Sequence, residues 1–140
     1  MANKERQLLT TELCSRFQYG LICEMSENGV TITDKLQLGG LNHFLDGTLE
    51  VKPYLRPISS LTEEEMDRLF EILNIDENGN DGNEWIKIND IGILRLFTHT
   101  GRDFYEIAEA LDYLHSIHID YRGLIHKGLA LEAPEGMYNK

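Results

Sequence analysis

The chain has 140 residues, of which 41% are hydrophobic and 26% are charged, and this is the size and composition of one globular domain. Its formal net charge of −11 argues against the broad basic surface by which proteins bind duplex nucleic acid and anionic membranes. No apolar run approaches the roughly 18 residues of a membrane span, and the N-terminal stretch lacks the apolar core of a signal peptide. We therefore predict a cytoplasmic protein that binds neither nucleic acid nor membrane.

The chain begins with a predicted short helix and a predicted strand. Residues 4–17 carry apolar side chains at helical spacing, and residues 19–25 alternate between core and surface types. One face of this strand carries Leu21, Cys23 and Met25. Cys14 and Cys23 both fall at predicted core positions, and their spacing predicts neither a disulfide framework nor a zinc site.

Two glycine-containing dipeptides predict tight hairpin turns. Asn28-Gly29 tolerates positive φ at both positions, and the β-branched residues that begin at Val30 predict the returning strand. Asp46-Gly47 is the second dipeptide, and it predicts a hairpin between residues 41–45 and residues 48–51.

Other glycines and prolines punctuate this region. Gly39-Gly40 interrupts the strand pattern. Pro53 and Pro57 predict the end of the sheet segment and an extended approach to the next helix.

The clearest element in the sequence is a helix over residues 62–74. Thr62 and Glu65 stand at the spacing of a capping box, in which each side chain accepts a hydrogen bond from the other residue's backbone N–H. An apolar stripe follows at i, i+3, i+4 and i+7, made by Met66, Leu69, Phe70 and Leu73. This stripe needs an apolar surface to cover.

A polar loop over residues 76–83 resembles the start of a calcium-binding loop. Asp76, Asn78 and Asn80 match the first three alternating ligands of an EF-hand. Asp81, however, stands where the turn needs glycine, and Lys87 stands where a bidentate glutamate is needed. The pattern therefore favours a flexible polar loop over a calcium site.

The second half of the chain predicts a hairpin, a long helix and an irregular arm. Residues 85–88 and 91–97 are strand-like and are separated by Asn89-Asp90. A helix is predicted over residues 103–117, with Asp103 and Glu106 as a weaker capping box. Its apolar face consists of Phe104, Ile107, Ala108, Leu111 and Leu114. From about residue 119, glycines and Pro134 predict a loop with at most one short strand.

Together these elements predict a single α+β domain over residues 1–140. Its sheet is mostly antiparallel and built of hairpins, and the two main helices, 62–74 and 103–117, pack on one side with the short N-terminal helix.

Two histidines near the end of the second main helix are candidate metal ligands. His115 and His118 lie on its inward side, and Asp120 and His126 follow. Zinc would require three or four such side chains to converge. The alternative is that these are buried, hydrogen-bonded histidines at a helix end. We assign no metal ligand, no cofactor-binding residue and no catalytic residue, since the sequence contains no nucleophile elbow, phosphate loop or dinucleotide fingerprint.

The C-terminal arm is a candidate partner surface. Tyrosine and arginine are the residue types that most often anchor protein interfaces. The candidate residues are Tyr121, Arg122, Leu124 and Ile125. The alternative is that this arm packs back on its own domain.

Residues 52–64 and 120–138 resemble stretches of a group of small uncharacterised proteins from gut Bacteroidetes genomes and the phages and mobile elements that they carry. The resemblance implies a bacterial cytoplasmic protein with a phage-linked context. It implies no activity, cofactor or catalytic residue.

Three functional hypotheses follow. The first is a non-enzymatic protein–protein interaction module that binds through its arm or its acidic helix. The second is an acidic decoy that binds a basic partner protein, because residues 61–84 hold nine acidic residues and one basic residue. The third is a small metal-dependent or hydrolytic enzyme that uses His115 and His118. The sequence leaves the oligomeric state open.

Overall fold

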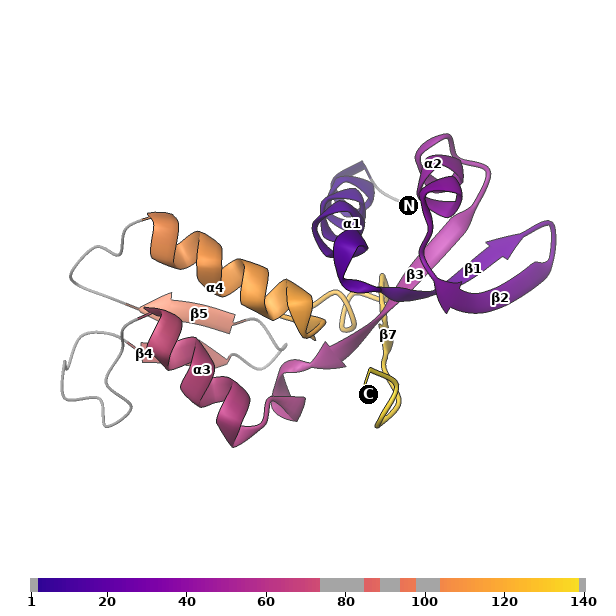
Figure 1. Cartoon of the computed structure of the whole chain (residues 1–140). Helices are drawn as coiled ribbons and strands as arrows, with labels where there is room; N and C mark the ends of the chain where they lie inside the picture. The colour runs from indigo at the N-terminus through magenta and orange to yellow at the C-terminus, as the bar shows by residue number, and fades with distance from the viewer. Residues whose placement is uncertain (1–2, 74–84, 89–93, 98–103, 139–140) are drawn as a thin grey trace.

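The computed structural model describes residues 3–73, 85–88, 94–97 and 104–138, which adopt the predicted class of fold, α+β (Figure 1). The helices are α1 (Asn3–Arg16), α2 (Leu38–Leu45), α3 (Glu63–Leu73) and α4 (Phe104–Ser116), with short 3-10 turns η1 (Phe17–Tyr19) and η2 (Ile58–Ser60). The strands are β1 (Ile22–Glu27), β2 (Val30–Lys35), β3 (Glu50–Pro57), β4 (Trp85–Ile88), β5 (Leu94–Phe97), β6 (Ile119–Asp120) and β7 (Leu131–Glu132).

The main sheet has the order β2-β1-β3-β6, and β7 also pairs with β3. β1 is antiparallel to both β2 and β3. The two short strands β6 and β7 run parallel to the second half of β3, with Arg56 opposite Ile119 and Tyr54 opposite Leu131. β4 and β5 form a separate antiparallel pair. The C-terminal arm therefore joins the main sheet through two short strands, where at most one was predicted.

The first hairpin forms as predicted. Asn28 and Gly29 have φ values of 52° and 81°, the positive values that a two-residue type I′ turn requires. Cys23 and Met25 lie on the buried face of β1 as predicted, and Leu21 is buried just before the strand begins at Ile22. Cys23 is buried in this face, whereas Cys14 is exposed on α1, so the prediction of a core position for Cys14 is wrong.

The predicted second hairpin is wrong, because residues 38–45 form the helix α2. Asp46-Gly47 ends that helix. Gly47 has φ 87°, its N–H donates to the Phe44 carbonyl at 3.1 Å, and the Thr48 N–H donates to the His43 carbonyl at 3.0 Å. These are the two hydrogen bonds of a Schellman motif, in which a glycine with positive φ closes a helix.

The glycine pair before this motif also lies inside α2 and does not break the chain's structure. A Cβ atom on Gly40 would stand 3.3 Å from Leu36 Cδ1 and 3.4 Å from Met25 Sδ. The missing side chain therefore allows α2 to approach β1 closely.

Pro57 ends β3 as predicted, whereas Pro53 lies inside the strand and does not end it. Pro53 lies opposite Cys23. The tight β1–β2 turn makes Glu27 and Val30 a hydrogen-bonded pair. Because hydrogen-bonded and non-hydrogen-bonded pairs alternate along an antiparallel ladder, the backbone groups of Cys23 form hydrogen bonds with β2 and not with β3. No donor is needed from Pro53 on the β1 side, so a proline fits there.

The two main helices form as predicted, but their described buried residues pack together with Ile58, Ile119 and Tyr121 and not on the face of the β1–β2 hairpin. The Thr62 N–H donates to Glu65 Oε1 at 2.9 Å and the Glu65 N–H donates to Thr62 Oγ1 at 3.1 Å, which completes the predicted capping box of α3. On α4 the predicted apolar face is partly wrong, since Ala108 is exposed while Ala110 is buried.

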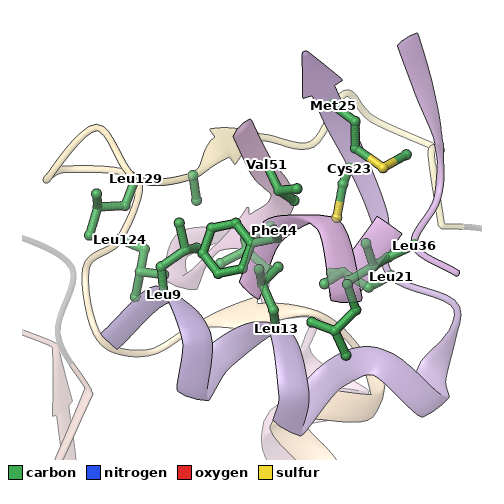
Figure 2. Packing of buried hydrophobic residues seen from close by; sticks show 13 residues of the cluster. Leu9, Leu13, Leu21, Cys23, Met25, Leu36, Phe44, Val51, Leu124 and Leu129 are labelled. Atoms are coloured by element: carbon green, nitrogen blue, oxygen red, sulfur yellow. The ribbon is translucent and has the colours of Figure 1, made fainter. Parts of the chain in front are cut away.

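Two buried clusters make up the described core. The first joins α1, α2, β1 and β3 to the C-terminal arm, and Figure 2 shows Phe44 at its centre between Leu9 and Leu13 of α1 and the sheet. The second joins α3 and α4 to Ile58, Ile119 and Tyr121. β3 extends from one to the other, as its path in Figure 1 shows.

Some predictions fall partly or wholly outside the described residues. The hairpin of β4 and β5 is confirmed, but its turn at residues 89–93 is not among those described. The polar loop over residues 76–83 and the cap at Asp103 also lie outside them.

Candidate functional site

A buried polar cluster joins α1 to the start of the C-terminal arm. The side chains of Glu12 and Arg16 are 1% and 0% exposed, and Arg16 Nε donates to Glu12 Oε2 at 3.1 Å. Arg16 Nη2 also donates to the Ile119 carbonyl at 2.6 Å, across 103 residues of sequence. Two residues one helical turn apart thus bring a full ion pair into the interior, where it ties α1 to β6.

His115 and Tyr121 extend this cluster. His115 Nε2 and the Tyr121 hydroxyl form a hydrogen bond of 2.7 Å, and His115 Nε2 lies 4.0 Å from Glu12 Oε2. Arg122 Nε lies 3.7 Å from Glu12 Oε1. The carboxylate of Glu12 is therefore shared by two guanidinium groups and approached by one imidazole.

Burial, more than the neighbouring charges, keeps the histidine of this cluster neutral. Burial, assisted by the positive charge of Arg16, lowers the pKa of His115 from 6.5 to about 4. Burial also raises the pKa of Tyr121, and the Glu12 carboxylate adds to that effect. At neutral pH the pair is a neutral imidazole and a protonated phenol. This hydrogen bond is buried in the interior, and its role is structural.

His118 belongs to a second buried contact, which is a ring stack and not a hydrogen bond. It has φ 63°, it is buried, and its ring stacks on Tyr138 with the centroids 3.8 Å apart. The Tyr138 hydroxyl donates to the Tyr54 carbonyl at 2.7 Å and accepts from the Ile22 N–H at 2.9 Å. Burial, again with Arg16, lowers the pKa of His118 to about 4. The end of the arm is thereby held against β1 and β3.

The structure does not bring the candidate zinc ligands together. The Asp120 carboxylate accepts the backbone N–H groups of Leu124 and Ile125, both at 2.9 Å, and His126 is exposed. Within residues 3–73, 85–88, 94–97 and 104–138, no three His, Cys, Asp or Glu side chains are grouped so that they could hold a metal ion. Burial raises the pKa of Cys23 to about 12, which keeps this thiol protonated.

Two of the four candidate partner residues lie in the interior. Leu124 is fully buried in the first cluster, and Tyr121 is buried in the second. Arg122 and Ile125 are half-buried. The arm packs on its own domain, so the structure gives no support to Tyr121 and Leu124 as partner contacts.

A different surface is open on the described structure. All six residues of β2 are exposed, including Val30 at 66% and Ile32 at 55%. Their partners across the hairpin are Glu27 and Met25. A groove of about 600 Å³ lies on this face between β2 and α2. Its lining includes Met25, Glu27, Val30, Ile32, Asp34 and Leu49.

β2 also forms one edge of the main sheet, and Figure 1 shows the β1–β2 hairpin at the margin of the fold, away from α3 and α4. The sequence predicts this strand but does not indicate that its whole length is exposed to solvent. The alternation of valine, isoleucine and threonine in Val30–Lys35 indicates a strand with one apolar face, and it contains no signal that says which element covers that face.

Comparison of the chain with protein-family models, with curated proteins and with solved structures finds no match. No helix among the residues that the structure describes is long and apolar enough to cross a bilayer.

Proposed function

We propose that the protein is a non-enzymatic protein–protein interaction module of a bacterial or phage-related system, and that its binding surface is the exposed edge and groove of β2. The observation that carries this proposal is the combination of an edge strand with two exposed apolar side chains, Val30 and Ile32, beside a groove of about 600 Å³. Apolar surface beside an open sheet edge is typical of a binding site for an extended segment.

Burial of this surface would be favourable. Covering the exposed parts of Val30 and Ile32 would contribute about 1–2 kcal/mol for each side chain. Pairing with the free edge would add backbone hydrogen bonds, which supply much of the affinity when a strand is added to a sheet.

The two other hypotheses have less support. An enzyme that used His115 and His118 would need these side chains to reach substrate, and both are buried. His115 is hydrogen-bonded to Tyr121 and His118 is stacked on Tyr138. A decoy would bind through the acidic groups of α3, and two of these five groups, Glu65 and Glu71, already pair with Arg56 and Arg68 respectively.

The experiment is affinity capture from a lysate of the native host with three forms of the protein. The double variant Val30→Thr/Ile32→Thr keeps β-branched residues on the strand but removes apolar surface. The matched control is Leu38→Gln, which changes an exposed leucine of α2 that is not among the groove-lining residues. A partner that is retained by the wild type and the control but lost by the double variant supports the proposal. A partner that binds all three forms equally contradicts it.

A further inference from the structure

We infer that the β2 edge takes an extended segment of a partner protein with a basic residue followed by two apolar residues at alternate positions, and that this segment pairs antiparallel to β2. The inference rests on the proposed function and adds the chemistry of the partner. It follows from the backbone of the edge, from the order of side chains on the groove face, and from the charge of that face.

The backbone of β2 offers alternate residues to a new strand. The two-residue turn makes Glu27 and Val30 a hydrogen-bonded pair, and Met25 with Ile32 is the next such pair. The N–H and C=O groups of Thr31 and Thr33 therefore point away from β1, toward the free edge. In the described part of the chain, no other strand pairs with this edge. A partner strand would form backbone hydrogen bonds with these two threonines.

The groove face fixes which partner side chains fit. Val30, Ile32 and Asp34 follow one another on this face, and all three line the groove. Residues directly opposite each other in an antiparallel pair lie on the same face, and apolar pairs and opposite charges are the favourable combinations. A partner strand should therefore place a basic side chain opposite Asp34 and apolar side chains opposite Ile32 and Val30.

Asp34 is available for such a pair. It is exposed, and its carboxylate accepts the N–H of Lys35 at 2.7 Å, a contact with its own neighbouring backbone. Among the described residues it forms no ion pair. Glu27 and Lys35 also line the groove, so its charged lining residues, two acidic and one basic, carry a net negative charge. This net charge favours a cationic segment.

A second copy of this chain fits less well. Each copy carries a net charge of −11, so two copies repel one another. In the antiparallel register that sets Val30 opposite Ile32 of the other copy, Asp34 would face Asn28. In the register that sets Ile32 opposite Ile32, Asp34 would face Val30. Neither register provides a cation for Asp34, whereas a basic partner segment does.

Antiparallel pairing fixes the order of the partner sequence. Read from its N-terminus, the segment meets Asp34 first, then Ile32 two residues later, and then Val30 two residues after that. A peptide with the core Lys-Thr-Val-Thr-Ile satisfies this order, because its threonines fall opposite Thr33 and Thr31. Antiparallel pairs are also slightly more stable per residue than parallel pairs, which favours this direction.

The test measures binding of fluorescein-labelled peptides to the full chain by fluorescence anisotropy. The three probes are Lys-Thr-Val-Thr-Ile, its reversed sequence Ile-Thr-Val-Thr-Lys, and Glu-Thr-Val-Thr-Ile, each with serine at both ends. The wild type should bind the first probe about fivefold more tightly than the other two, which is the range expected from one cross-strand charge pair and from direction. Asp34→Lys should reverse the preference so that the glutamate probe binds best.

The outcomes separate this inference from the function on which it rests. Equal binding of the lysine and glutamate probes, or an unchanged preference in Asp34→Lys, overturns the inferred partner chemistry. If Val30→Thr/Ile32→Thr nevertheless loses its captured partner, the interaction module stands with a different partner segment. Analytical sedimentation gives a further outcome. If the wild type is a dimer and Val30→Thr/Ile32→Thr is a monomer, the inference is overturned, because the occupant of the edge would then be a second copy.

Discussion

Replacement of Arg16 with methionine should lower the free energy of unfolding by about 3–5 kcal/mol. The substitution keeps an unbranched side chain of similar length but leaves the carboxylate of Glu12, which is 1% exposed, without its 3.1 Å partner. It also removes the donor to the Ile119 carbonyl, and an unpaired buried acceptor costs about 1–3 kcal/mol of that total. Most of the loss comes from the buried charge that remains.

The double variant Glu12→Leu/Arg16→Met should be less destabilised than the sum of its two single variants, because it leaves no unpaired ion in the interior. Urea denaturation followed by circular dichroism measures the free energy of unfolding of the wild type, the two single variants and the double variant. The matched control is the helical pair Arg68 and Glu71, whose side chains are 51% and 72% exposed, and Arg68→Met should cost less than about 0.5 kcal/mol. Additive single variants, or an Arg16→Met loss no larger than that of Arg68→Met, would refute the reasoning.

The remaining predictions test caps, glycines and pH. Thr62→Ala should cost about 1 kcal/mol through the lost cap, and an unchanged melting temperature would count against it. Gly47→Ala should cost about 1 kcal/mol of stability because Gly47 has a positive φ. Gly39→Ala, in α2 with open space around it, should be neutral or should stabilise the fold by up to about 1 kcal/mol. Equal effects of the two substitutions in thermal unfolding would contradict the Schellman motif. Stability should fall as the pH drops from 6.5 toward 4, on the order of 2 kcal/mol per buried histidine at pH 5, because His115 and His118 have folded pKa values of about 4 and the unfolded chain then binds protons that the folded chain does not. Urea titrations at pH 7 and pH 5 should show a smaller loss for His115→Asn than for the wild type, and the exposed control His126→Asn should keep the full loss.

Local signals predicted local structure well. The capping box of α3 depends on two residues three apart, Thr62 and Glu65, and both hydrogen bonds are present. Asn28-Gly29 also acts locally, since both residues adopt the positive φ that the turn needs.

Asp46-Gly47 shows why the same reasoning failed elsewhere. A glycine with positive φ serves both a type I′ turn and a helix end, so the dipeptide alone does not distinguish them. Leu38, Leu41 and Leu45 recur at helical spacing, and this was the signal for α2. Gly39-Gly40 is typical of a break in a strand, but in α2 the missing side chain of Gly40 allows the close contact with Met25.

The polar cluster was predictable only in part. Glu12 and Arg16 stand four residues apart beside Leu9 and Leu13, a spacing that places an ion pair on the buried face of a helix. The carbonyl that Arg16 reaches lies 103 residues away, and no local pattern could indicate it. The docking of the arm, which buries Tyr121 and Leu124, could not be predicted for the same reason, because it depends on contacts with distant elements.

The first cluster places a constraint on the order of folding. It needs Leu9 and Leu13 from the start of the chain together with Leu124 and Leu129 from near its end. During synthesis the N-terminal hairpin and α1 therefore emerge long before the residues that complete their core. The contacts that close this core span more than 100 residues, and such long-range contacts are typical of slowly folding domains. A nascent chain that stalls before residue 124 would present this unfinished core to the cell's chaperones.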